Sequence, residues 1–213
     1  MRGWMIAIAA VFALAGCAAE SVWAPDEAVT RAAYRHDGPP SLTLFTMLNN
    51  HTDAGAHTAL MINGSQRVIF DPAGSFKHET IPERNDVLYG ITPPVADVYT
   101  RYHARKTYRV RIQRLDVSPE TAERAIALAK AAGPVPSAQC SLATSRILAE
   151  LYPGQVKTSW LPRKTADEFG AIPGVRQGPD TSAFVGHDDL ITDHHADTEA
   201  VITAELVGRT AAL

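Results

Sequence analysis

The sequence has few cysteines and no concentration of charge. Its 213 residues include two cysteines, Cys17 and Cys140, and the formal net charge is only −3. No cluster of lysine and arginine offers a phosphate-binding stripe, which argues against a nucleic-acid partner. Internal repeats and low-complexity tracts are also absent. A hydrophobic content of 46% is sufficient for one domain with a proper core.

The apolar stretch at the amino terminus, Trp4–Leu14, is too short to span a bilayer as a permanent helix. Arg2 precedes it with a single positive charge, so residues 1–16 are predicted to be an export signal that is removed. The stretch runs into LAGC at residues 14–17, which resembles the lipobox of bacterial lipoproteins. An ordinary secretory signal followed by a chance cysteine is the alternative.

In such lipoproteins the signal is cleaved before the cysteine, and acyl chains such as palmitate are attached to that residue. The resemblance therefore implies that Cys17 is lipidated and anchors the protein to a membrane, because several acyl chains on one residue bind stably. Ala18 follows the cysteine in place of aspartate, which favours the outer membrane with the domain facing the periplasm. Residues 17–40 would then form a lipidated tether that contains one short helix.

Lipidation of Cys17 leaves Cys140 as the only thiol, so no internal disulfide can form. An unpaired thiol in an oxidising compartment is a liability unless it is buried or used chemically. Apolar residues recur with helical spacing after Cys140, and a Pro-Gly pair ends the pattern. This pattern predicts a helix over residues 140–151, capped by Ser137 or Gln139.

Cys140 therefore falls in the first turn of a predicted helix. The free amide hydrogens and the positive end of the helix dipole at that position stabilise a thiolate and lower the pKa of the thiol. The same amides can hold the oxyanion of a tetrahedral intermediate. These features favour a reactive cysteine, and the alternative is a small, buried, structural cysteine.

The segment HTALMINGSQRVIFD, residues 57–71, predicts a hairpin that turns at its Asn-Gly pair. A two-residue turn would place His57 and Asp71 on opposite faces of the sheet. An odd loop, such as a three-residue turn with Gly64 or Ser65 in the left-handed conformation, places them on one face. We predict the odd loop because it collects a purely apolar set on the opposite face. This set is Leu60, Ile62, Val68 and Phe70.

A carboxylate beside an imidazole fixes the tautomer and stabilises the imidazolium, which makes the histidine a useful base for a thiol. The chain thus supplies three candidate groups in the order His57, Asp71, Cys140. Further elements lie around and between them. Strands are predicted at residues 41–48, 57–62, 66–71 and 107–117, and helices at residues 119–132 and 140–151. The first helix would have Ser118 as its cap and Pro119 at its first position. The pattern indicates one α+β domain with a mostly antiparallel sheet and packed helices.

The motifs also resemble a known family. HTALMINGSQRVIFDPAG is similar to the histidine strand, short turn and third-residue strand of the papain-like NlpC superfamily, and QCSLATSRIL is similar to its nucleophile helix. Because the histidine strand comes first, the likeness is to the circularly permuted branch, which includes the lecithin:retinol acyltransferase-like proteins. It extends over about residues 41–170 and implies a permuted papain-like domain at residues 41–213. Carried over, it makes Cys140 the nucleophile, His57 the base and Asp71 the orienting residue, a position where the family commonly has histidine or another polar residue.

The resemblance implies a lipid-anchored cell-envelope cysteine hydrolase that cleaves an amide or peptide bond through a thioester on Cys140. Peptidoglycan peptides are the nearest polymeric substrate. Two alternatives stay open: an acyl-lipid or acyl-amide hydrolase or transferase of the same fold, and a non-catalytic envelope lipoprotein that binds a ligand in the same cleft. No cofactor is expected.

Other polar residues receive simpler interpretations. His51 and Asp53 are predicted in a solvated turn, and His103 in a solvated connector. The segment GHDDLITDHHADTE, residues 186–199, is rich in histidine and aspartate but lacks a known metal-ligand spacing, so we predict no metal site. After about residue 175, only EAVITAELV has the pattern of a strand.

Overall fold

The structure, a computed structural model, describes residues 19–104 and 107–178. The predicted signal peptide, the lipidation site Cys17, the histidine- and aspartate-rich segment and the predicted last strand all lie outside the described residues. Within the described ranges the protein is an α+β fold with a seven-stranded antiparallel sheet and five helices. No helix in these ranges has the length and apolar character needed to cross a membrane.

The sheet has the spatial order β4-β5-β3-β2-β1-β6-β7. Its strands are β1 (Ser41–Asn49), β2 (Gly55–Asn63), β3 (Arg67–Phe70), β4 (Glu83–Arg84), β5 (Val87–Leu88), β6 (Tyr108–Asp116) and β7 (Arg176–Gln177). The helices are α2 (Asp26–Ala32), α3 (Pro93–His103), α4 (Pro119–Ala131), α5 (Cys140–Leu151) and α6 (Pro162–Gly170). The strands predicted from hydrophobic alternation, β1, β2, β3 and β6, form the centre of this sheet.

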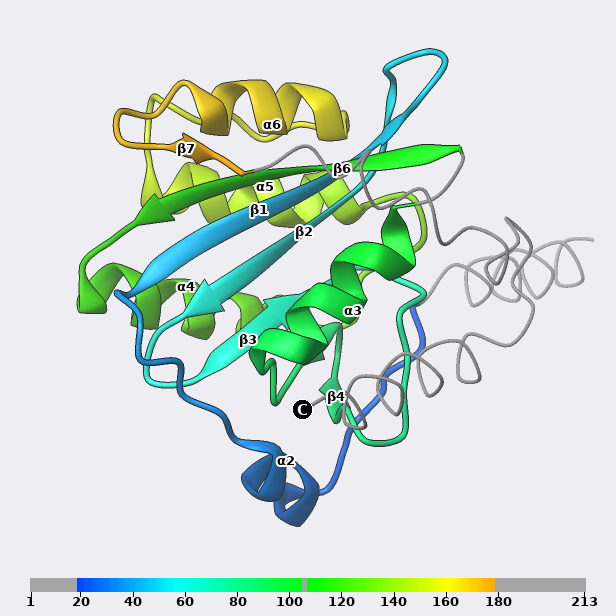
Figure 1. Ribbon diagram of the computed structural model, residues 1–213, viewed down its shortest axis with the longest axis vertical. Coiled ribbons are helices and arrows are strands. Elements are labelled where there is room, and N and C mark those ends of the chain that lie inside the picture. Colours follow the sequence, from blue (N-terminus) through cyan, green and yellow to red (C-terminus); the bar gives the residue numbers. More distant parts are fainter. Residues whose placement is uncertain (1–18, 105–106, 179–213) are drawn as a thin grey trace, which may run out of the picture.

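Helices cover both faces of the sheet (Figure 1). The helices α4, α5 and α6 pack on one face, and α3 crosses the other. Because side chains alternate along a strand, even-numbered and odd-numbered residues of β1, β2 and β3 enter two separate cores. The first core includes Leu42, Leu44, Leu60, Ile62, Val68 and Phe70. The second includes Phe45, Met47, Ala59, Met61 and Ile69.

The predicted parity of the hairpin is confirmed. Asn63 pairs with Arg67 across a three-residue loop, and the four predicted apolar residues all lie in the first core. The predicted left-handed residue in the loop is wrong, because neither Gly64 nor Ser65 has a positive φ. Instead, Glu123 of α4 binds the loop: its carboxylate accepts hydrogen bonds from the amide and the hydroxyl of Ser65, at 2.5 and 2.9 Å. A tertiary contact thus fixes a turn that local propensity would shape differently.

Both predicted helices are confirmed. The α4 helix begins with the Ser118 hydroxyl accepting a hydrogen bond from the Thr121 amide, and Pro119 occupies its first position. The α5 helix begins at Cys140, with Gln139 as its N-cap residue, but the predicted side-chain cap is wrong because no side chain forms a capping hydrogen bond there. The segment at 162–169 included in the family resemblance forms α6.

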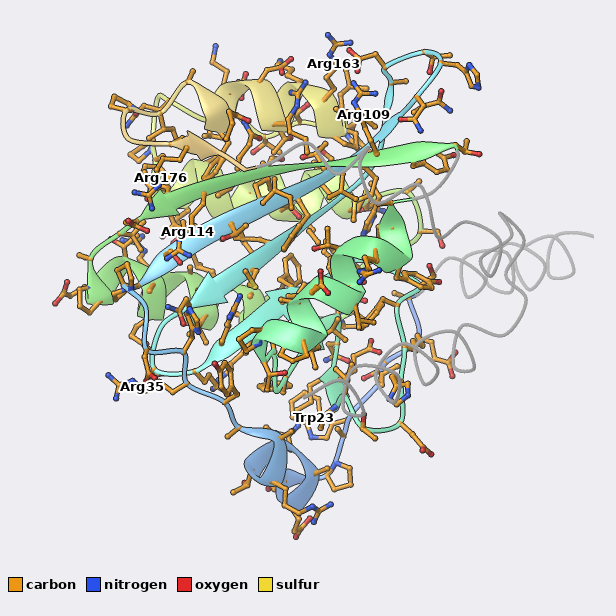
Figure 2. The ribbon with its side chains drawn as sticks, in the orientation of Figure 1. Trp23, Arg35, Arg109, Arg114, Arg163 and Arg176 are labelled. Atoms are coloured by element: carbon orange, nitrogen blue, oxygen red, sulfur yellow. The ribbon has the colours of Figure 1, made fainter. Side chains whose placement is uncertain are left out.

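The residues expected to form a tether lie against the domain where the structure describes them. The Ala24 amide donates to the Glu83 carbonyl at 2.9 Å, and the Arg67 amide donates to the Tyr34 carbonyl at 2.8 Å. The short helix expected in this stretch is α2. Trp23 remains 65% exposed, with the Arg84 guanidinium 4.7 Å from the ring centroid, at the end of the molecule that carries α2 (Figure 2).

Candidate active site

A β-bulge lies directly before His57. Met47 of β1 pairs with His57, but Leu48 pairs with Gly55, so Ala56 is an extra residue in β2. His57 lies on the same face as the second core, and its side chain is 16% exposed. On the other side of β2, pairing with β3 runs only from Leu60 to Asn63. The backbone around His57 is therefore not paired with β3, which leaves room for a group from another element.

Asp71 directly follows β3 and reaches His57. Its Oδ1 atom lies 2.7 Å from His57 Nε2, and the same oxygen accepts a hydrogen bond from the Tyr99 hydroxyl at 2.7 Å. Burial alone would raise the pKa of Asp71, but the hydrogen bond and charge of His57, the charge of His103 and the Tyr99 hydroxyl hold it below its ordinary value. Asp71 is therefore a buried, ionised carboxylate that fixes the orientation of the imidazole.

The turn after Asp71 shapes the space for its carboxylate. Ala73 has a φ of 56°, and the Gly74 amide donates a hydrogen bond to the Asp71 carbonyl at 3.0 Å. A Cβ atom added at Gly74 would lie 1.9 Å from Asp71 Oδ2. Only a glycine at position 74 leaves the Asp71 carboxylate in place, so Gly74 is a structural requirement of the His57–Asp71 contact.

Cys140 brings a thiol to the unpaired stretch of β2. It is the first residue of α5 and is 6% exposed. Burial alone would raise the pKa of the thiol, but a hydrogen bond to His57, the charge of His57 and the backbone amides of Thr58 and Ser141 lower it. Two amide hydrogens from different elements thus point at the sulfur, where they stabilise negative charge.

His57 connects the two other groups. Burial alone would lower the pKa of the imidazole, but the hydrogen bonds to Asp71 and Cys140 and their negative charges raise it to about 10. Since Nε2 faces Asp71, the second ring nitrogen is the one left to face the thiol. The structure therefore brings together all three residues singled out in the sequence, in the order carboxylate, imidazole, thiol.

Tyr99 and His103 belong to this cluster, and the sequence analysis missed both. The interpretation of His103 as part of a solvated connector is wrong, because it is the last residue of α3 and its ring stacks on His57 at 5.9 Å between centroids. The Tyr99 carbonyl lies 2.8 Å from His103 Nδ1. Burial and the adjacent Asp71 charge raise the pKa of Tyr99 well above its ordinary value, so its hydroxyl stays protonated and donates to Asp71.

A signal for α3 was present in the sequence. Thr92 and the two prolines after it have the pattern of a helix start, since threonine caps helices and proline suits their first positions. Apolar or aromatic residues then recur at helical spacing. They are Val95, Val98, Tyr99 and Tyr102.

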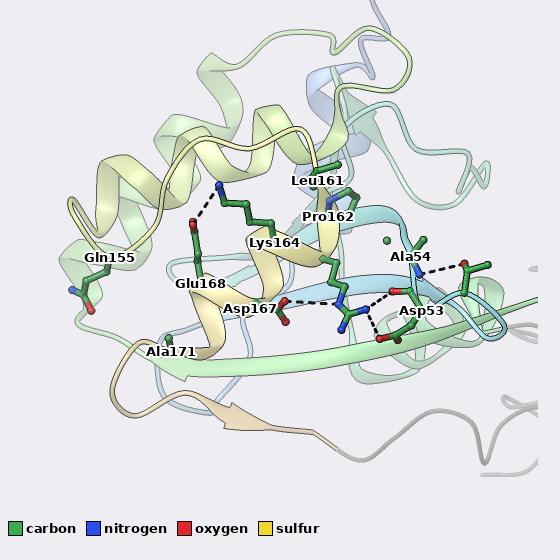
Figure 3. A pocket seen from close by; sticks show the side chains of 12 residues that line it. Asp53, Ala54, Gln155, Leu161, Pro162, Lys164, Asp167, Glu168 and Ala171 are labelled. Atoms are coloured by element: carbon green, nitrogen blue, oxygen red, sulfur yellow. Dashed lines mark hydrogen bonds and ion pairs between the residues drawn. The ribbon is translucent and has the colours of Figure 1, made fainter.

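The β1–β2 loop and α6 border a separate pocket of about 650 Å³ (Figure 3). His51 is exposed, as predicted for a solvated turn, but Asp53 forms ion pairs with Arg109 and with Arg163, the latter at 2.5 Å (Figures 2 and 3). The interpretation of Asp53 as a merely solvated residue is therefore wrong. Its charge instead holds the loop to β6 and α6.

The start of α6 also lies close to the candidate site. The Ser141 hydroxyl, next to Cys140, lies 2.9 Å from the Thr165 hydroxyl in the first turn of α6. A Cβ atom at Gly55, two residues before His57, would lie 2.8 Å from Pro162 Cβ. The start of α6 therefore contacts residues that are close in the sequence to Cys140 and His57.

Among the described residues, His57, Asp71 and His103 could offer metal ligands, with the ligand atoms within 4.8 Å of one another. We interpret the group as a hydrogen-bonded set instead, because Asp71 Oδ1 already contacts both His57 Nε2 and the Tyr99 hydroxyl. An ion would have to break these bonds. In comparisons with known proteins, no family model, no curated protein and no solved structure matches the chain.

Proposed function

We propose that the protein is a lipid-anchored cysteine hydrolase of the cell envelope with a circularly permuted papain-like fold. The observation that carries the proposal is the chain of contacts from Asp71 through His57 to Cys140 at the start of α5. The lowered pKa of the thiol, caused by His57 and two backbone amides against the effect of burial, supports a thiolate–imidazolium pair. The order of the histidine strand before the cysteine helix supports the permuted arrangement.

The reaction uses only these groups and water. The Cys140 thiolate attacks the carbonyl carbon of an amide, and the amides of Thr58 and Ser141 are placed to stabilise negative charge beside the sulfur. The C–N bond breaks, His57 gives its proton to the leaving amine, and a thioester remains on Cys140. Water then gives a proton to His57 while its oxygen attacks the thioester, which releases a carboxylic acid and restores the ion pair. Peptide bonds of peptidoglycan are the proposed substrate class.

An acyl lipid is the second candidate substrate. The observation in its favour is an exposed apolar pair, Trp160 and Leu161, which are 59% and 63% exposed. The pair directly precedes α6, in which Thr165 contacts Ser141, the residue next to Cys140. An acyl chain that reached Cys140 along this side would contact both residues.

Acylation of the thiol tests the proposed function. We expect an activated acyl ester to leave its acyl group on Cys140, detected by intact-protein and peptide mass spectrometry, and the adduct to disappear over time as water cleaves it. A Cys140→Ser variant should carry no thioester, and His57→Ala should be acylated far more slowly. An N-acyl dipeptide ester and a fatty-acyl ester, compared at equal concentration, separate the two substrate classes. Absence of any adduct on Cys140 with both esters would leave a non-catalytic binding lipoprotein as the better description.

The membrane anchor is a separate part of the proposal. We expect the mature protein to begin at Cys17 and to carry acyl chains there, because residues 14–17 resemble a lipobox. Mass spectrometry of the amino-terminal peptide measures this, and Cys17→Ser should yield an uncleaved, unacylated chain. A native protein with a mature terminus free of acyl chains would contradict the anchor while leaving the hydrolase proposal intact.

A further inference from the structure

The short hairpin formed by β4 and β5 touches two segments of the candidate site. Arg84 pairs with Val87, which leaves a two-residue turn of Asn85 and Asp86. Both turn residues have positive φ values, 45° and 65°, as a tight turn between antiparallel strands requires. We call this pair the Asp86 turn. The backbone that follows the turn is held in the sheet, because β5 pairs with the end of β3 and Val87 lies opposite Phe70.

The Asp86 turn holds the segment that carries Asp71. The Asp71 amide donates a hydrogen bond to the Asp86 carbonyl at 2.8 Å. The Asp86 carboxylate also accepts a hydrogen bond from the backbone of Ala73, the residue with positive φ in the turn after Asp71. Asp86 therefore contacts the beginning and the middle of the turn that places the Asp71 carboxylate against His57.

The same carboxylate holds the segment that leads to the thiol. The Val135 amide donates to Asp86 Oδ2 at 2.7 Å, and the Val135 side chain is buried in the first core. Between Val135 and Cys140 the chain contains Ala138 with a φ of 65°, a conformation that L residues rarely adopt. A strained loop needs fixed ends, and Asp86 provides one of them.

We propose that Asp86 is a positioning residue. Its carboxylate joins the loop before Cys140 to the turn after Asp71 and so keeps the Cys140 thiol next to the His57 imidazole. The proposal rests on the proposed function, because it gives a role in the reactivity of Cys140 to a residue that touches neither the sulfur nor the substrate. Without the carboxylate, this direct link between the two segments would be lost.

The ionisation of Asp86 gives the proposal a distinctive signature. Burial, together with the negative charges of Glu83 and Asp71, raises the pKa of Asp86 to about 6, although the amides of Val135 and Ala73 act in the opposite direction. Above that pH the bonds to these amides are charge-assisted, and below it they involve a neutral acid and weaken. The positioning effect should therefore be strong at neutral pH and fade in mild acid.

The test compares Asp86→Asn and Asp86→Ala with the wild-type full chain. The asparagine keeps an oxygen acceptor without a titrating charge, whereas the alanine removes the acceptor. Glu79→Gln is the matched control, because Glu79 is an exposed carboxylate of the preceding loop. The readout is the rate of Cys140 alkylation by iodoacetamide between about pH 5 and pH 8, which follows the thiolate fraction. Thermal melting at each pH establishes that the variants are folded.

At about pH 7.5 we expect Asp86→Ala to be alkylated about tenfold more slowly than wild type, since small displacements of reacting groups have large effects on rate. Asp86→Asn should be about two- to threefold slower, because a neutral acceptor forms the weaker bond. The ratio of the wild-type alkylation rate to the Asp86→Asn rate should approach one as the pH falls below about 6, the pKa of Asp86. Glu79→Gln should follow wild type throughout.

The proposal would be overturned if the ratio of the wild-type to the Asp86→Asn alkylation rate were constant across the pH range. It would also be overturned if Asp86→Ala were alkylated at the wild-type rate. If Asp86→Ala does not fold, the ratio for Asp86→Asn decides alone. Failure of the proposed function gives a different result: His57→Ala would then leave the alkylation of Cys140 unchanged, whatever the Asp86 variants do.

Discussion

Replacing Asp71 by alanine is expected to destabilise the protein by about 3 kcal/mol or more at neutral pH, since removal of one partner from a buried ion pair leaves the other uncompensated. Asp71 is 3% exposed and contacts both His57 and Tyr99. Urea unfolding measures the loss. Asp71→Asn is the matched variant, and it should lose less because it keeps the shape and an acceptor for the Tyr99 hydroxyl.

The effect of Asp71→Ala should depend on pH in a defined direction. The pKa of Asp71 is held below its ordinary 3.8 by His57 despite burial, so its stabilising contribution is present above that value and disappears as the pH falls below it. The pKa of His57 is raised to about 10, so its contribution is present below its ordinary 6.5 and disappears as the pH rises through 10. The difference in unfolding free energy between wild type and Asp71→Ala should thus be largest between about pH 3.8 and pH 6.5, where both contributions are present. A difference that does not change with pH would contradict the ion pair.

Replacing His57 by alanine is expected to raise the pH at which Cys140 is alkylated to about 8.5 or above, the value of an ordinary or buried thiol. In the wild type, His57 and the amides of Thr58 and Ser141 lower the pKa of the thiol against the effect of burial. The variant keeps only the amides, which cannot supply a full positive charge. Alkylation rates as a function of pH, with Cys140→Ser as blank, measure the shift.

His51→Ala provides the control for the His57 experiment, because His51 is an exposed histidine on the loop that precedes the same strand. It should leave the profile unchanged. If His57→Ala gives the profile of the control, Cys140 has no imidazolium partner, and the structural-cysteine alternative describes it better.

The parts of the fold that follow local periodicity could be predicted from the sequence. Alternation of apolar residues predicted β1, β2, β3 and β6, and helical spacing predicted α4 and α5. The parity of the hairpin could be predicted because the other parity would place Arg67 and Asp71 on the same face as Leu60 and Ile62. The strands β4, β5 and β7 have two residues each, too few for a periodicity to show. Their positions depend on pairing partners distant in the sequence.

The same distinction applies to the candidate site. His57, Asp71 and Cys140 could be found because each sits at a recognisable point of a strand or helix. Tyr99 and Asp86 act through contacts 28 and 49 residues away in the chain, with Asp71 and Val135 respectively, which only the folded structure reveals. His103 had a local signal in the pattern of α3, but its charged surroundings favoured the interpretation as a connector.

Titration of the Cys140 thiolate by its ultraviolet absorbance tests the central claim most directly. The full chain with Cys17→Ser contains Cys140 as its only thiol, and the same chain with Cys140→Ser corrects for tyrosine ionisation. If the thiolate and the His57 imidazolium form an ion pair, the thiolate signal persists well below about pH 8.5 and is lost only in mild acid. A thiolate that appears only at about pH 8.5 or above, with no change in His57→Ala, would contradict the account.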